Sequence, residues 1–278
     1  MNYRHAYHAG NFADVVKHAL LTLVLAHLKR KDAPFCVIDT HAGIGRYDLS
    51  SVEAGKTLEY QDGIGRLMAG GDWPEMLADY RSALQAVNPG WPELTAYPGS
   101  PRISRHMLRD QDRLALVELH PEDVQTLRRG FRNDPQVGVH QQDAYVALKA
   151  LLPPKERRGL VLVDPPFEVK DEFRRIARGL AEAIRRWPTG IYGVWYPIKE
   201  REPVERFLGE LAALGKPCFA AELYRLPPDD PARLNGTGMA VINPPWQLDE
   251  ALAALLPVLH DRLGGSGGTS LRWIVEPT

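Results

Sequence analysis

Cysteine is nearly absent from this 278-residue chain, which carries only Cys36 and Cys218. Both lie within apolar stretches, and the sequence contains no Cys-x-x-Cys pair. A disulfide framework and a zinc–thiolate site are therefore not expected, and the natural compartment for such a chain is a reducing one.

Long apolar runs and an excess of one charge are also missing. No apolar stretch approaches the roughly 20 residues of a membrane span, and the opening MNYRHAYHAGN lacks the regions of a secretory signal. We therefore expect a cytoplasmic protein. The 34 Lys and Arg residues nearly balance the 35 Asp and Glu residues, so only local basic clusters can argue for nucleic-acid binding.

Strand-like segments alternate with helix-like segments over most of the chain. The helix expected first spans residues 11–30, with Asn11 or Asp14 as its cap. The expected strands are a short one ending near Asp39, then 113–120, 137–144, 159–167 and 190–197, and three more in a β-rich C-terminal part. This alternation predicts an α/β fold with a mostly parallel, doubly wound sheet.

One stretch interrupts that alternation. Residues 46–98 have no strand-like runs and contain short helical segments punctuated by Gly, Pro and Trp. We therefore predict a small inserted helical subdomain at 46–98, with 1–45 and 99–278 forming the main domain.

Polar residues follow several of the predicted strands, at the sheet edge where α/β proteins bind ligands. The loop DTHAGIG at 39–45 has glycines that let a ligand approach the backbone, although His41 departs from G-x-G-x-x-G and a plain tight turn is the alternative. Glu118 could accept from ribose hydroxyls or be a surface residue. Asp143 could accept from an adenine amino group, cap the next helix, or do both.

The most specific signal follows residues 159–163, where the chain reads Asp-Pro-Pro-Phe from Asp164 to Phe167. Two prolines fix the backbone and remove two donors, which leaves the Pro165 carbonyl beside the Asp164 carboxylate. Two rigid acceptors suit the two N–H bonds of an exocyclic amine, and Phe167 offers a stacking face for a base.

Motifs along nearly the whole chain carry a family resemblance. YRHAYHAGNFADVVKH, DTHAGIGRY, YPGSP, VELHP, VDPPF, WYP and INPPW together resemble the RlmJ family of bacterial 23S ribosomal RNA adenine-N6 methyltransferases. The resemblance implies a Rossmann-like S-adenosylmethionine-dependent methyltransferase fold, 23S rRNA as partner, base flipping, no metal and a monomer.

The resemblance also implies roles for individual residues. Asp164 is the expected catalytic acceptor. The residues expected around the cofactor are His18, His41, Ser100, Glu118, Asp143, Ala144 and Asp164, and those expected near the substrate are Pro165, Phe167, Tyr3, His5 and Lys17. Phe167 is a departure, because relatives often carry Tyr there, but stacking does not need the hydroxyl.

Three alternative functions share some of these sequence features. A DNA adenine-N6 or protein glutamine methyltransferase uses similar Pro-Pro-aromatic loops but lacks the N-terminal motif. A nucleotide-binding oxidoreductase shares the sheet but needs G-x-G-x-x-G, and a non-catalytic RNA-binding protein would not need Glu118, Asp143 and Asp164.

Two further features are candidate sites: a second Pro-Pro tetrapeptide and a pair of histidines. Asn-Pro-Pro-Trp at 243–246 follows a late strand, far from the expected cofactor, so we predict a structural role. His5 and His8 are spaced H-x-x-H, but no third and fourth ligand is evident, so we expect no metal site.

Three basic clusters are candidates for a phosphate-binding rim. They are Arg102, Arg105 and Arg109; Lys155, Arg157 and Arg158; and Arg174, Arg175, Arg178, Arg185 and Arg186.

Overall fold

The computed structural model describes residues 4–227 and 232–277. Its centre is an eight-stranded sheet with the order β10-β8-β9-β7-β6-β1-β4-β5. The strands are β1 (Cys36–Asp39), β4 (Arg113–Glu118), β5 (Val137–Gln141), β6 (Gly159–Val163), β7 (Ile191–Ile198), β8 (Cys218–Tyr224), β9 (Gly236–Ile242) and β10 (Gly268–Val275). All the strands predicted in the main domain are confirmed, with small shifts at their ends.

The sheet is mostly parallel, as predicted. β1 pairs in parallel with β4 and β6, β4 with β5, and β6 with β7. Only β9 and β10 run against the other strands, because β9 pairs antiparallel with β7 and β8, and β10 antiparallel with β8. The strand order reverses beside β1, and the carboxyl ends of β1, β4, β5 and β6 therefore meet at one edge, where this class of sheet binds ligands.

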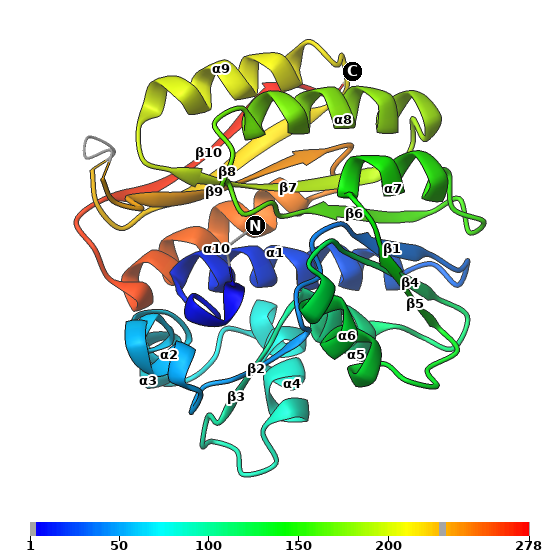
Figure 1. Cartoon of the computed structure of the whole chain (residues 1–278). Helices are drawn as coiled ribbons and strands as arrows, with labels where there is room; N and C mark the ends of the chain where they lie inside the picture. The colour runs from blue at the N-terminus through cyan, green and yellow to red at the C-terminus, as the bar shows by residue number, and fades with distance from the viewer. Residues whose placement is uncertain (1–3, 228–231, 278) are drawn as a thin grey trace.

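Helices cover both faces of the sheet (Figure 1). One face carries α7 (Ala144–Leu151), α8 (Glu172–Arg186) and α9 (Arg201–Ala212), and the other carries α1 (Phe12–Lys29), α5 (Ser100–Met107), α6 (Pro121–Gly130) and α10 (Leu248–Leu263). Side chains alternate along each strand, so Val37 belongs to the core on the α1 face of the sheet while Ile38 belongs to the core on the α8 face. None of the helices among the described residues has the length and apolar character needed to cross a membrane.

The first helix is positioned by its cap and by its burial. The Asn11 side chain accepts a hydrogen bond from the Asp14 amide, which satisfies one of the free N–H groups of the first turn. Of the two predicted caps, Asn11 is thus the one used. Asp14, Lys17 and His18 lie on the same helix and are nearly fully buried, an arrangement that needs partners for each charge.

Residues 46–98, for which an inserted helical subdomain is predicted, contain short helices and also two strands. The helical elements are α2 (Val52–Thr57), η2 (Gln61–Gly65), α3 (Arg66–Ala69), η3 (Glu75–Leu77) and α4 (Ala78–Val87). β2 (Arg46–Asp48) and β3 (Ala96–Pro98) pair antiparallel where the segment leaves and rejoins the main domain. The prediction of no strands at 46–98 missed these two, because three residues are too few to show an alternating pattern. Figure 1 shows the segment beside α1, away from α8 and α9.

The 243–246 motif follows β9, which runs antiparallel to β7. It therefore lies at the opposite edge of the sheet from the carboxyl end of β6. The side-chain Nδ2 of Asn243 donates to the carbonyls of Pro188 and Gly190 at 3.0 and 2.8 Å, while Trp246 is 77% exposed. These bonds tie the end of β9 to the start of β7, in keeping with a structural role.

Candidate active site

A cavity of about 560 Å³ opens at the carboxyl ends of β1, β4, β5 and β6. That volume suits a small-molecule ligand. The cavity wall brings together every predicted site residue that the structure describes: His5, Lys17, His18, His41, Ser100, Glu118, Asp143, Ala144, Asp164, Pro165 and Phe167. Tyr3 lies outside the described residues.

The loop after β1 forms the floor of this cavity. Gly43 has φ +59, and a Cβ there would lie 2.2 Å from the Tyr47 hydroxyl, so only glycine fits. The Thr40 hydroxyl donates to the Leu162 carbonyl at 2.9 Å and contacts His41 Nδ1 at 2.8 Å. Burial lowers the pKa of His41 to about 4, so its ring is neutral at physiological pH.

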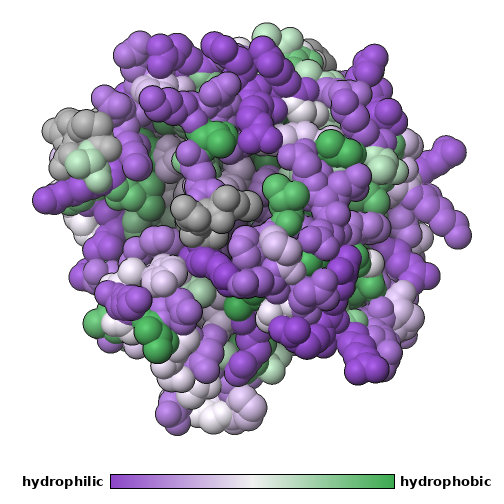
Figure 2. Space-filling model, viewed as in Figure 1, coloured by the Kyte–Doolittle hydropathy of each residue, from purple (hydrophilic) through white to green (hydrophobic). Residues whose placement is uncertain are grey.

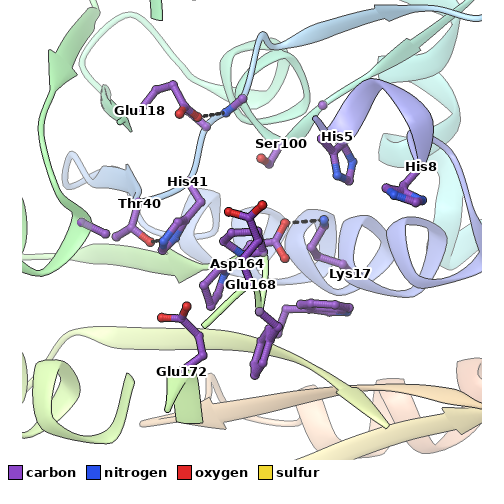
Figure 3. Close-up of a pocket in the computed structure, with 18 of the residues that line it drawn as sticks. His5, His8, Lys17, Thr40, His41, Ser100, Glu118, Asp164, Glu168 and Glu172 are labelled. Carbon is purple, nitrogen blue, oxygen red and sulfur yellow. Dashed lines mark hydrogen bonds and ion pairs between the residues drawn. The ribbon is translucent and has the colours of Figure 1, made fainter. Parts of the chain in front are cut away.

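Glu118 at the end of β4 holds the same loop. Its Oε2 accepts from the Gly43 amide at 2.8 Å, and its Oε1 accepts from the His120 amide at 2.7 Å. Figure 3 shows the Glu118 carboxylate beside this loop. Burial raises the pKa of Glu118 despite these bonds. Each carboxylate oxygen has a second lone pair, so Glu118 can still accept from ligand hydroxyls.

Asp143 begins α7. Its Oδ1 accepts from the amides of Tyr145 and Val146 at 3.0 and 3.1 Å, which makes it the N-cap. Its Oδ2 lies 3.4 Å from Arg175, and the cavity reaches both Asp143 and the buried Ala144. The capping alternative is therefore present in the structure, and it leaves one carboxylate oxygen on the cavity side.

The Asp164 loop lies at the end of β6, opposite α1. Phe167 has a left-handed backbone, with φ +53, a conformation that is uncommon for an aromatic residue and that clusters at functional sites. Its ring packs edge-on against Phe173 and Trp195, with centroids 4.9 and 5.7 Å away. Trp195, from β7, also lines the cavity.

Lys17 connects the N-terminal helix to this loop. Its ammonium lies 2.7 Å from Asp14 Oδ1 and 2.5 Å from Asp164 Oδ2, and its side chain is only 4% exposed (Figure 3). Burial alone would lower the pKa of Lys17, but the two carboxylates raise it above its usual value. Lys17 therefore stays charged and fixes one oxygen of Asp164.

Asp14 is the second anchor of that ammonium. Its Oδ2 accepts from the Gly10 amide at 2.8 Å and contacts His5 Nε2 at 2.9 Å. Burial alone would raise the pKa of Asp14, but His5 and Lys17 hold it well below its usual range. His5, Asp14, Lys17 and Asp164 thus form one continuous chain of side-chain contacts from the N-terminal segment to the Pro-Pro loop.

Two buried polar atoms beside the cavity lack a partner among the described residues. They are His18 Nε2 and Asp39 Oδ2. Burial raises the pKa of Asp39 to about 6, and the charge of Asp164 adds to the effect. Burial lowers the pKa of His18 to about 3. A donor and an acceptor left open in this way fit a ligand with both cationic and anionic groups, as the zwitterionic end of S-adenosylmethionine has.

The described residues contain no cluster of three or more His, Cys, Asp or Glu side chains able to hold a metal ion. His8, half of the H-x-x-H pair, instead faces Glu59 of the inserted segment at 2.9 Å. That contact raises the pKa of His8. His5 turns to Asp14, so the two histidines have different partners.

Sequence reasoning gave no site role to Asp14, Asp39, Tyr97 or Trp195. Asp14 stands three residues before Lys17, a spacing that places both on one helix face, and Trp195 belongs to the quoted WYP motif. Tyr97 lies in a three-residue strand of the inserted segment, and its contact with His18 crosses 79 residues of sequence. No local pattern reveals a contact of that range.

Comparisons with known proteins agree with one another. Residues 32–275 match the family model described as "Ribosomal RNA large subunit methyltransferase D, RlmJ". The chain is 44% identical to "Ribosomal RNA large subunit methyltransferase J" of Escherichia coli (strain K12), over 99% of each chain. The protein of that name from Haemophilus influenzae is also 44% identical, over 99% of both chains.

A solved structure supports the fold. A crystal structure of a protein from Legionella pneumophila superposes with a TM-score of 0.88 at 35% identity, covering 96% of this chain and 97% of that one. Similarity of this extent over the whole length confirms the family resemblance and the methyltransferase fold predicted from the sequence. The chain belongs to the RlmJ family of ribosomal RNA large subunit methyltransferases.

Proposed function

We propose that this chain transfers a methyl group from S-adenosylmethionine to the exocyclic N6 amine of an adenine in 23S ribosomal RNA. The family membership supports the cofactor and the RNA. The Asp164 loop is the observation that supports an exocyclic amine as the methylated group, because a carboxylate, a proline carbonyl and an aromatic ring there face one cavity.

The cofactor would lie over β1, β4 and β5. Glu118 is placed to accept from ribose hydroxyls, Asp143 and the Ala144 amide to read the adenine ring, and His18, Ser100 and Asp39 to meet the zwitterionic end. When bound, the cofactor supplies an electrophilic methyl group on a sulfonium.

The target adenine must leave its stack to enter the cavity, which costs a few kcal/mol in a duplex and less in a loop. Phe167 is placed to stack on it, with Trp195 bracing the Phe167 ring. Asp164 and the Pro165 carbonyl accept the two N6 hydrogens, which favours localisation of the nitrogen lone pair toward the methyl group. Positioning supplies most of the rate enhancement.

Lys17 defines the role of Asp164 in this scheme. The ammonium 2.5 Å away holds Oδ2 of Asp164 and leaves the other carboxylate oxygen to accept from N6. N6 becomes acidic only after methylation, so the proton can pass to Asp164 or to water, and no strong base is needed.

The basic face of α8 is the surface that we propose for the RNA. Of the three predicted clusters, Arg105 and Arg109 are paired with Asp134 and Asp112, and Arg158 donates to main-chain carbonyls at the other sheet edge. On α8, by contrast, Arg174, Arg178 and Arg186 are exposed and make no hydrogen bond or ion pair with a described residue.

α8 begins beside the cavity, because Glu172 and Arg175 line it. The surface over α8 and α9 is strongly hydrophilic (Figure 2). Replacing Arg178 and Arg186 by Ala should raise KM for RNA severalfold and lower the salt slope by about 0.7 per lost phosphate contact. Arg206→Ala on α9, where Glu202 pairs the arginine at 3.2 Å, is the matched control and should change neither.

The reaction is tested by transfer of labelled methyl to unmodified 23S RNA, with 16S RNA and duplex DNA alongside. Nucleoside digestion should give N6-methyladenosine from 23S RNA only. Asp164→Ala, which removes the acceptor, should lower kcat by roughly 10²–10⁴-fold, while Asn243→Ala in the other Pro-Pro loop should leave it unchanged. Label in DNA, or wild-type-like activity of the Asp164→Ala enzyme, would contradict the proposal.

A further inference from the structure

Three buried polar side chains form a continuous hydrogen-bonded chain behind the cavity. Tyr80 of α4 and Tyr97 of β3 are both fully buried, and their hydroxyl oxygens lie 2.8 Å apart. The Tyr97 hydroxyl lies 2.7 Å from Nδ1 of His18, which is 1% exposed. Both tyrosines come from the inserted segment, whereas His18 comes from α1 and lines the cavity.

The direction of the protons in this chain follows from counting donors. Burial lowers the pKa of His18 to about 3, so its ring is neutral and carries one N–H. If Tyr80 donates to Tyr97 and Tyr97 donates to His18 Nδ1, every hydroxyl proton has an acceptor and the histidine proton is on Nε2.

The opposite direction leaves more groups unsatisfied. If His18 Nδ1–H donates to Tyr97, Tyr97 must donate to Tyr80, and among the described residues neither the Tyr80 proton nor the Nε2 lone pair then has a partner. The first direction leaves only Nε2–H without a partner, on a residue that lines the cavity, where a ligand can accept from it. Because each unsatisfied buried polar group is costly, the first direction is favoured, and it offers Nε2–H to the ligand.

We propose that Tyr97, backed by Tyr80, sets the His18 tautomer so that Nε2–H binds the carboxylate of the cofactor's amino-acid end. The inserted segment thus acts as a positioning element for cofactor recognition. The inference rests on the proposed function, because it takes S-adenosylmethionine as the ligand.

The surroundings favour a carboxylate at this end of the cavity. Ser100 is the first residue of α5, where the positive end of the helix dipole attracts an anion. Most of the charges that line the rest of the cavity, such as Glu118, Asp143 and Asp164, are negative and would repel a carboxylate there. A neutral N–H donor can hold an anion without adding a competing ion pair to Asp39.

The two tyrosines provide a matched pair of variants. Tyr97→Phe removes the donor to Nδ1, whereas Tyr80→Phe removes a hydroxyl of the same buried pair and leaves that donor in place. Titration calorimetry should show S-adenosylmethionine binding about tenfold weaker in Tyr97→Phe and within about twofold of wild type in Tyr80→Phe. Decarboxylated S-adenosylmethionine should bind wild type and both variants within about twofold of one another.

A structural role alone would weaken both ligands together, and that result, or equal effects of the two variants, would overturn the inference. The tautomer is read directly in the wild-type protein from ¹⁵N shifts of labelled histidine, with His18→Gln identifying the signal. A proton on Nε2 is expected, and one on Nδ1 would refute the relay even if Tyr97→Phe failed to fold. Wild type that binds neither ligand would instead remove the proposed function.

Discussion

Replacing Lys17 by Met should destabilise the protein by removing the cation between two carboxylates. The methionine side chain has a similar length and fits a buried position, so the change mainly deletes the charge. In the folded protein Asp14 and Lys17 are 2% and 4% exposed, and Asp164 is 15% exposed. Solvent cannot replace the lost ammonium at Asp14.

Breaking a buried ion pair by removing one partner costs about 3–5 kcal/mol, because the remaining charge stays buried. His5 and the Gly10 amide still contact Asp14, so we expect the lower half of that range. At roughly 2 °C per kcal/mol for a chain of this size, Tm should fall by about 6–8 °C.

The loss of stability in Lys17→Met should depend on pH in a defined direction. Because the pKa of Asp14 is depressed in the folded protein, the ionised carboxylate stabilises the wild type at pH values above the ordinary carboxyl pKa of 3.8. This stabilisation is lost as the pH falls further. In Lys17→Met, burial is no longer offset by the ammonium, so the pKa of Asp14 rises and acid stabilises the variant relative to wild type. The deficit should therefore be full at pH 7 and shrink as pH falls toward 4.

Urea unfolding followed by circular dichroism at pH 4 to 8 measures this deficit. Lys29→Met, at the far end of the same helix and without an ion pair to any described residue, is the control and should be nearly neutral. Adding Asp14→Asn to Lys17→Met should recover most of the loss, because no fully buried charge then lacks a partner. A deficit below about 1 kcal/mol at pH 7, or one that does not change with pH, would refute the reasoning.

Three further outcomes are expected. Affinity for S-adenosylmethionine should weaken as pH falls from 7 to 5. The pKa of Asp39 is raised to about 6, so its carboxyl group becomes neutral over this range, whereas the cationic ligand favours the ionised form. Calorimetry on Asp39→Asn should show an affinity that does not change with pH, and an affinity that still changes would exclude Asp39 as the cause. Phe167→Tyr should keep near-normal turnover while Phe167→Ala loses roughly tenfold or more through lost stacking, and equal activities in the methyl-transfer assay would argue against a base at Phe167. Asn243→Gly should lower the free energy of unfolding by about 1–2 kcal/mol with unchanged kcat, and lost activity would show that the β9 loop takes part in the reaction.

The fold was predictable where the pattern was local and repeated. Strands β4, β5, β6 and β7 are each flanked by a helix, and alternation of that kind specifies a parallel sheet without knowledge of any contact. The pairing of β9 between β7 and β8 was not predictable, because the order of strands in space leaves no periodic trace. The pair β2–β3 was missed since it has only three residues a strand.

Site residues, like the elements of the fold, were predictable only where a local sequence pattern places them. Residues that directly follow strands, such as Glu118, Asp143 and Asp164, could be assigned to one sheet edge from topology alone. His5, Lys17 and His18 came from the family resemblance, since nothing in a helical pattern says that its buried face meets a strand end 147 residues later. Their roles in binding and catalysis stay predictions.

The buried polar residues of α1 indicate a functional role that the helical pattern of its sequence does not. A helix with Asp14, Lys17 and His18 all inside the protein is poorly suited to a simple core, because each buried polar group must be paired at a cost in solvation. Asp14 and Lys17 satisfy each other and reach Asp164, whereas His18 is satisfied on one nitrogen by Tyr97 and left open on the other. The pairings therefore divide the helix into a charged part, which contacts the Asp164 loop, and a neutral part, in which one nitrogen of His18 has no partner among the described residues. Such a division also explains why the inserted segment packs against α1, since it supplies Tyr80 and Tyr97 behind the neutral part and Glu59 beside the N-terminal turn.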